Sequence, residues 1–187
     1  MMTSGPIAQL GFVVRDLDKA LQHWVDFLGV GPFFVADEIK PDQFVHRGRS
    51  SDATFSAALA NSGPTQIELI QPLGEHPSQW QEFLKAGREG LQHVAYWTED
   101  FDVDFAAAQA KGHRVAHGGL LSGGRFVYFD ADIADGYAIE LSEQSPEKKA
   151  VFGAIREAGI DWDGQDPIRP WAQALSAAGV PVRGGGS

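Results

Sequence analysis

IAQLGFVVRDLDKALQHW, residues 7–24, is the stretch that decides the fold. Residues 7–14 have the β-branched and aromatic content of a strand, and Asp16 then stands where an N-cap would begin a helix. Apolar residues at helical spacing follow, up to a stop at Gly29. The stretch LQHVAYWTEDFDVDFAAA, residues 91–108, has the same order of strand, acidic cap and helix. The plan of a strand followed by a helix therefore occurs twice.

One offset aligns both copies, since Gln9 and His93 are 84 residues apart and the same offset pairs Asp16 with Asp100. Strand-like segments follow each helix, at residues 33–35, 54–61 and 65–70 in the first copy and at 114–117, 125–130 and 137–142 in the second. An internal repeat of this kind predicts an α+β fold built from two tandem βαβββ modules.

The plan divides the chain into four segments. They are a first module at 7–75, a linker helix within 76–90, a second module at 91–145, and a C-terminal helix with a flexible tail at 146–187. Ser78 and Gln81 have capping-box spacing at the start of the linker helix, and Val151 and Ile155 share one face of the C-terminal helix. We expect these segments to form one structural domain, with a flexible Arg-Gly-Gly-Gly-Ser end.

Composition narrows the classes of function. The 187 residues carry a formal charge of −10, which repels phosphate backbones and argues against a nucleic-acid partner. No apolar stretch approaches the roughly 20 residues needed to span a bilayer, and the N-terminus is not a signal sequence, so we expect a cytoplasmic protein with no membrane partner. Cysteine is absent, so only nitrogen and oxygen atoms could bind a metal ion.

Polar residues recur at equivalent places in the two copies. Side chains alternate along a strand, so the first and last strands of each module can each place one ligand on a single side of the sheet. These ligands are Gln9, Glu68, His93 and Glu140. Both glutamates stand in apolar runs, where a buried carboxylate needs a positive partner such as a divalent cation. The alternative is that each polar residue faces solvent on a half-exposed sheet.

Five further residues are candidates for substrate binding. His46 and Arg49 belong to the only basic cluster and could bind a carboxylate or phosphate group, although an exposed loop explains them equally well. Trp97 shares the face of His93, and Arg125 and Tyr128 belong to the strand that precedes Glu140. Core packing is the alternative explanation for both aromatic residues.

The segments AQLGFVVRDLDKALQHW, QIELIQP, LQHVAYWTEDFD and YAIELSE resemble the vicinal oxygen chelate superfamily over about residues 7–145. This superfamily includes glyoxalase I, methylmalonyl-CoA epimerase, extradiol dioxygenases and bleomycin-resistance proteins. The resemblance implies that the modules curve into a partly open β-barrel around one divalent ion held by the four ligands named above. Zn, Ni, Co, Mn or Mg would suit these ligands, and Fe is less favoured.

The order of the ligands is similar to that of glyoxalase I, whereas the sequence of the segment IELIQPLGE is closer to that of methylmalonyl-CoA epimerases. Two departures separate the chain from both relatives. The places of the glutathione contacts of glyoxalase I hold Val13, Pro72 and Glu89. The additional glutamate of the epimerases has no counterpart in Thr54-Phe55-Ser56.

The resemblance therefore implies a homodimeric, metal-dependent isomerase, epimerase or lyase. It would transfer a proton next to a carbonyl group in a small or acyl-carrier-linked substrate, such as a carbonyl compound or hydroxy acid, with Glu140 or, less favourably, Glu68 as the base. Two alternatives are a non-catalytic binding protein for a small molecule and an Fe(II)-dependent extradiol dioxygenase. The second needs another histidine ligand, whereas we expect His23, His76, His113 and His117 to be structural or solvated.

Overall fold

The computed structural model describes residues 5–130 and 136–181. Within them the strands form one mixed sheet of 11 strands, in the order β11-β2-β5-β6-β1-β7-β10-β9-β8-β3-β4. Five α-helices pack against this sheet, so the predicted α+β class is confirmed. No helix in these ranges is long and apolar enough to cross a bilayer.

The first half of the sheet carries one helix on its outer side. Its elements are β1 (Gln9–Val13), α1 (Leu17–Gln22), β2 (Phe33–Ile39), β5 (Thr54–Ser62) and β6 (Thr65–Leu73). Asp16 caps α1, since its side chain accepts a hydrogen bond from the backbone N–H of Lys19. A π-helical turn, η1 (His23–Phe27), continues α1. This turn shifts the helical register, so Leu28 is exposed although helical spacing alone places it on the buried face.

The second half has the same plan and follows a short linking helix. That helix is α2 (Gln79–Lys85), and the later elements are β7 (Gly90–Thr98), α3 (Phe101–Ala110), β8 (Val115–Leu121), β9 (Gly124–Phe129) and β10 (Ala138–Glu143). Ser78 caps α2 through the backbone N–H of Gln81, as the capping-box spacing predicts.

The two halves join where β1 pairs antiparallel with β7. Each of these strands also has a parallel partner, β6 for β1 and β10 for β7. The registers correspond, because Gly11 pairs with Glu68 and Ala95, which lies 84 residues after Gly11, pairs with Glu140. The glutamates therefore occupy equivalent positions beside the central strand pair, which is the arrangement that an internal repeat predicts.

Two strands that follow β2 in the first half of the chain extend the edge of the second half of the sheet. β3 (Asp42–His46) and β4 (Arg49–Ser50) form a hairpin, and β3 pairs antiparallel with β8. The sequence prediction missed these strands and treated the segment as a connection. The alternating pattern that indicates a strand is short here, because only Phe44 and His46 are buried between exposed neighbours before the turn at Gly48.

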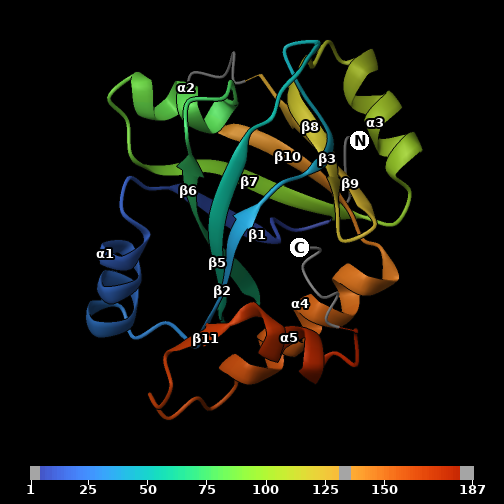
Figure 1. The fold of residues 1–187 in the computed structure, drawn as a ribbon. Coiled ribbons are helices and arrows are strands. Elements are labelled where there is room, and N and C mark those ends of the chain that lie inside the picture. Colours follow the sequence, from blue (N-terminus) through green and yellow to red (C-terminus); the bar gives the residue numbers. More distant parts are fainter. Residues whose placement is uncertain (1–4, 131–135, 182–187) are drawn as a thin grey trace.

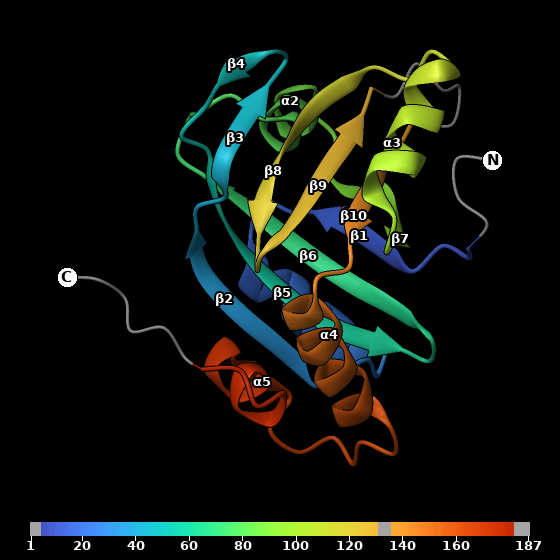
Figure 2. The ribbon, with the colours of Figure 1, turned by 90° about the vertical axis from the view of Figure 1, so that its right-hand side faces the viewer.

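Helices cover both sides of the curved sheet (Figures 1 and 2). On the outer side, Leu17 and Leu21 of α1 pack on β5 and β6, and Phe101 and Ala108 of α3 pack near Phe129 and Leu141. The largest core cluster lies on the inner side and combines strand residues with residues of α2, α4 and α5. The sheet therefore has helices outside each half and a shared core within its curve.

The chain after the second half folds back over this inner core. α4 (Pro146–Gly159) is the predicted C-terminal helix, and Val151 and Ile155 are buried on its inner face. The chain beyond α4 stays against the sheet, because β11 (Ile168–Pro170) pairs with β2 and is followed by α5 (Trp171–Ala177). The final Arg-Gly-Gly-Gly-Ser lies outside the described residues.

We predict that Ile155→Ala destabilises the protein by about 2 to 5 kcal/mol, because Ile155 is fully buried between α4 and the sheet and its removal leaves a cavity. Chemical denaturation should show the loss. Arg156→Ala changes the exposed neighbour on the same helix and should stay within about 0.5 kcal/mol of the wild type. Equal stability of all three proteins would contradict the packing of α4 on the sheet.

Candidate metal centre

Three side chains from different strands converge on one point. Nε2 of His93, on β7, lies 3.4 Å from a carboxylate oxygen of Glu68, on β6, and 3.3 Å from one of Glu140, on β10. The candidate ligand atoms of the three residues lie within 4.8 Å of one another. His93 is fully buried, and the side chains of Glu68 and Glu140 are 15% and 8% exposed. This cluster lies within one chain, so it needs no second copy to assemble.

The place of His93 depends on a glycine across the central strand pair. Gly11 is the antiparallel partner of His93. A Cβ atom at Gly11 would lie only 1.7 Å from Cε1 and 2.1 Å from Nε2 of His93, so the ring occupies the space that any other side chain would fill. Position 11 therefore needs glycine, because only the absence of a side chain lets the imidazole lie this close to the backbone of β1.

A second contact of His93 selects the nitrogen that faces the carboxylates. Its Nδ1 donates a hydrogen bond to Oε1 of Gln92 at 3.0 Å. In the neutral ring Nε2 then has the free lone pair, and Nε2 is the atom that faces Glu68 and Glu140. Such an outer hydrogen bond is what orients a metal-binding imidazole.

Burial and close charges perturb all three groups. Burial alone lowers the pKa of His93, but the contacts with Glu140 and Glu68 outweigh it and raise this pKa to about 9. Burial raises the pKa of Glu68. Burial also opposes ionisation of Glu140, yet the contact with His93, with smaller effects of Lys148 and Tyr128, lowers the pKa of this carboxyl. Without a metal ion, a protonated imidazole therefore balances the charge of this cluster near neutral pH.

Gln9 and Tyr128 complete the surroundings of the cluster. Nε2 of Gln9 donates to Oε1 of Gln66 at 2.8 Å, which leaves the oxygen of the Gln9 amide as its possible cation ligand. The Tyr128 hydroxyl lies 3.3 Å from Nε2 of His93, and burial raises the pKa of this phenol well above its ordinary value.

These residues fit a divalent cation. One imidazole and two carboxylates offer nitrogen and oxygen donors that suit zinc and similar ions, and their negative charges would neutralise a dication. The outer hydrogen bond to Gln92 supports the same assignment.

The cluster opens into a cavity of about 310 Å³ on the inner side of the sheet. Gln9, Glu68 and Glu140 line this cavity, and so do Trp97 and Tyr128. Both aromatic residues were candidates for substrate binding from the sequence, and the structure places them in the cavity that the candidate ligands line. Most other lining groups are apolar, which makes the cavity suitable for a small organic molecule.

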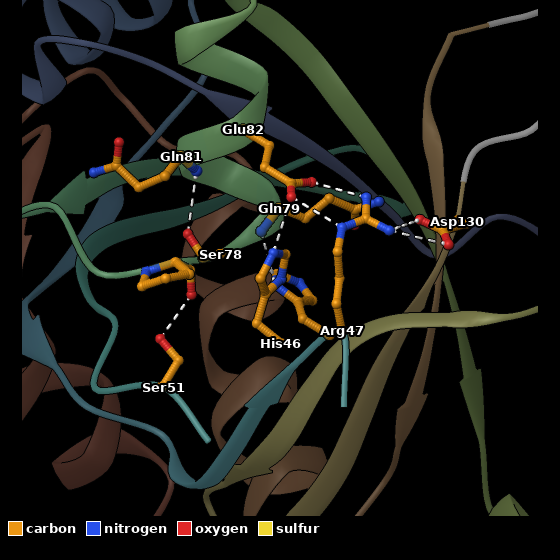
Figure 3. A network of polar contacts seen from close by, with 10 residues as sticks. His46, Arg47, Ser51, Ser78, Gln79, Gln81, Glu82 and Asp130 are labelled. Carbon is orange, nitrogen blue, oxygen red and sulfur yellow. Dashed lines mark hydrogen bonds and ion pairs between the residues drawn. The ribbon is translucent and has the colours of Figure 1, made fainter. Parts of the chain in front are cut away.

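His46 and Arg49 are not among the residues that line this cavity. Nε2 of His46 lies 3.0 Å from Oε1 of Glu82, and the neighbouring Arg47 forms ion pairs with Glu82 and Asp130 (Figure 3). Arg49 is exposed on the β3–β4 hairpin. This network ties the hairpin to α2, and the substrate contact expected of His46 and Arg49 stays a prediction.

Arg125 is likewise placed on the outer face. Its guanidinium pairs with Glu143 at 2.8 Å and with Asp102 at 2.7 Å, and it lies over the ring of Phe101. Side chains alternate along β9, so Arg125 points away from the side on which Phe126 and Tyr128 line the cavity. Its contacts fasten α3 to the sheet outside the cavity, and a substrate role of Arg125 stays a prediction.

Lys148, in the first turn of α4, is among the cavity residues that the sequence analysis did not predict. Lys148 is 5% exposed, and its Nζ donates to Oγ of Ser142 at 2.9 Å. The signal was available, because Lys148, Val151 and Ile155 have the spacing of one helical face. A lysine is nevertheless usually expected to extend its ammonium group into solvent.

Comparison with protein-family models matches residues 8–129 to the Glyoxalase/Bleomycin resistance protein/Dioxygenase superfamily. No curated protein matches the chain significantly.

Several solved structures are similar in fold. A hypothetical protein from Bacillus halodurans C-125 is 18% identical, with a TM-score of 0.60 over 76% of this chain and 96% of its own. Methylmalonyl-CoA epimerase from Mycobacterium tuberculosis is 23% identical, with a TM-score of 0.56 over 80% and 97%. A singly substituted variant of the Streptomyces coelicolor epimerase, in complex with 2-nitronate-propionyl-CoA, is 22% identical, with a TM-score of 0.52 over 76% and 96%. At these identities the likeness concerns the fold alone.

We predict that Gly11→Ala weakens the binding of a divalent ion at least about tenfold, because the new methyl group displaces the ring of His93. Competition with a chelating dye would measure the change for Zn²⁺. Gly153→Ala is the control, since no atom lies within 4 Å of a Cβ there, and it should leave metal affinity unchanged and stabilise α4 by about 0.5 to 1 kcal/mol. Unchanged metal affinity in Gly11→Ala would contradict the placement of His93.

We also predict that Zn²⁺ binding at pH 7 releases about one proton, because His93 is protonated below its pKa of about 9 and must be neutral to bind a metal ion. Affinity should therefore rise between pH 7 and pH 9. Calorimetry in buffers of different ionisation enthalpy counts the protons. His23→Gln, which changes an exposed histidine, should release the same number, and zero release from the wild type at pH 7 would contradict the prediction.

Proposed function

The chain belongs to the glyoxalase/bleomycin resistance protein/dioxygenase superfamily, and from this membership and the geometry of its cavity we propose that it is a divalent-metal-dependent enzyme. The proposed reaction is proton transfer at a carbon next to a carbonyl group, as in an isomerase, an epimerase or a lyase. The observation that carries the proposal is the buried cluster of Glu68, His93 and Glu140 at the wall of an apolar cavity.

We propose that His93, Glu68 and Glu140 hold the ion, with the oxygen of Gln9 as a fourth candidate ligand. A bound dication would polarise the carbonyl group of the substrate and stabilise the negative charge that develops on its oxygen. The apolar walls exclude water, which strengthens this electrostatic effect within the cavity.

The contacts favour Glu68 as the base, in place of the expected Glu140. Glu140 is held by His93 and also by a hydrogen bond from the Tyr128 hydroxyl, which suits a fixed ligand. Glu68 also contacts His93, and its side chain is the more exposed of the two carboxylates. Its carboxylate is therefore the better placed to take a proton from a substrate carbon in the cavity.

The dimensions of the cavity bear on the substrate. A volume of about 310 Å³ accommodates a small acid or carbonyl compound, or the acyl part of a larger thioester. A similar fold occurs in an epimerase complex with 2-nitronate-propionyl-CoA, and an acyl-carrier-linked substrate is the corresponding proposal here. The homodimer expected from the sequence stays a prediction.

A carbonyl-exchange assay tests the proposed function. Protein loaded with Zn²⁺, Ni²⁺, Co²⁺ or Mn²⁺ is incubated in D₂O with small ketones, oxo acids, hydroxy acids and acyl thioesters, and proton NMR follows the carbon next to the carbonyl. We expect metal-dependent exchange of that hydrogen in one chemical class. If the protein binds a stoichiometric metal ion but exchanges hydrogen in none of these compound classes, the proposed reaction is contradicted. If it binds no metal ion, a non-catalytic binding protein is favoured. Oxygen consumption with catechols under Fe(II) would favour a dioxygenase.

We predict that Glu68→Gln lowers exchange by about 10²- to 10⁴-fold while the protein keeps its metal ion, because an amide oxygen can still bind a cation but cannot accept the proton. Glu140→Ala removes a ligand atom altogether and should weaken metal binding instead. Elemental analysis and the exchange assay separate the two effects. Glu75→Gln changes an exposed carboxylate and should alter neither. Full exchange in Glu68→Gln would assign the base elsewhere.

A further inference from the structure

Lys148 is a buried cation that forms no ion pair with a carboxylate of the described residues, and Glu140, Glu68 and Glu143 act on it only from beyond contact distance. Its side chain reaches Ser142, a neutral hydroxyl, and no carboxylate of residues 5–130 and 136–181 lies within 4.0 Å of its Nζ. A buried ammonium group is costly unless a negative charge or several hydrogen bonds compensate it. The position therefore has the properties of a binding site for an anion.

This ammonium shares its cavity with the candidate metal ligands. Lys148, Ser142, Glu68 and Glu140 all line the same space. The two glutamates would neutralise a dication, which leaves the ammonium as one uncompensated positive charge in the enclosed part of the cavity. Asp37 also lines the cavity, but it is exposed and hydrated at the rim. The enclosed part therefore favours a ligand with a single negative charge.

Two aromatic residues of the C-terminal elements, Phe152 and Trp171, line the cavity that holds Lys148. Phe152 of α4 packs on Trp97 of β7, with ring centroids 5.1 Å apart, and Trp171 of α5 lines the same cavity. These helices follow residue 129, where the match to the family model ends. Figure 2 shows α4 and α5 together on one side of the sheet. The specificity of this cavity is therefore set in part by residues beyond the shared family region.

We propose that Lys148 and Ser142 bind the carboxylate of a small, largely apolar acid, whose carbonyl group faces the cluster of Glu68, His93 and Glu140. The part of this inference that concerns the carbonyl group rests on the proposed function. The part that concerns the carboxylate rests on the buried cation and the aromatic walls.

Two near-isosteric probes test the carboxylate site. 4-Oxo-4-phenylbutanoate carries an aryl ketone and a carboxylate, and 4-oxo-4-phenylbutanamide replaces only the charged group. Quenching of tryptophan fluorescence measures the binding of each, with and without Zn²⁺, since Trp80, Trp97 and Trp171 line the cavity. We expect the wild type to bind the acid at least about tenfold more tightly than the amide in both states.

Lys148→Met should abolish this preference and leave the amide affinity and the zinc stoichiometry unchanged. Lys149→Met is the matched control, because Lys149 is the next residue of α4 and pairs with Glu99 at the surface. It should keep the preference. Thermal unfolding should show Lys148→Met to be at least as stable as the wild type, since it removes a buried charge that forms no ion pair with a described carboxylate.

Three results would overturn the inference. They are equal affinity of the wild type for the two probes, a preference for the acid that survives in Lys148→Met, and tighter binding of a phosphonate of the same size. Failure of the proposed function has a different signature, because the acid then binds through Lys148 while no metal-dependent exchange occurs in D₂O.

Discussion

The antiparallel pairing of β1 with β7 is the constraint on which the rest of the structure depends. It joins the halves of the sheet, and it places Gly11 directly opposite His93. Each strand then carries a parallel neighbour that brings one glutamate toward the junction. A shift of one residue in this register would turn the three side chains of the candidate metal centre to different faces. The fold and the site are therefore specified by the same hydrogen bonds.

The junction also brings charged groups together in a buried region, where removing a charge from water has an unfavourable free energy. Two carboxylates, one imidazole and one ammonium line or adjoin a cavity whose other walls are largely apolar. Such a group contributes little to stability compared with an apolar core of the same volume. Its presence supports the proposed role of the cavity in binding and chemistry, and the outer ion pairs of Arg47 and Arg125 hold the surrounding elements in place.

Much of this arrangement could be predicted from the sequence because two regular signals coincide in it. The period of two along each strand, combined with the repeated order of elements, predicts that Glu68, His93 and Glu140 lie on one side of the sheet, where the structure brings them together. Residues whose positions depend on tertiary pairing were not predictable in this way. His46 depends on the hairpin that crosses to β8, and Arg125 on which face of β9 is inside. The position of Lys148 depends on where α4 packs, and helical spacing does not define that surface.

The hairpin of β3 and β4 has a consequence for synthesis of the chain. Its partner β8 starts at Val115, so roughly 70 further residues must leave the ribosome before the pairing can form, which takes about 4 to 14 s at ordinary translation rates. During this interval the nascent first half presents an unpaired strand edge, a known starting point for aggregation. Asp42, Arg47 and Arg49 flank this edge with charges, which protects it until the second half arrives.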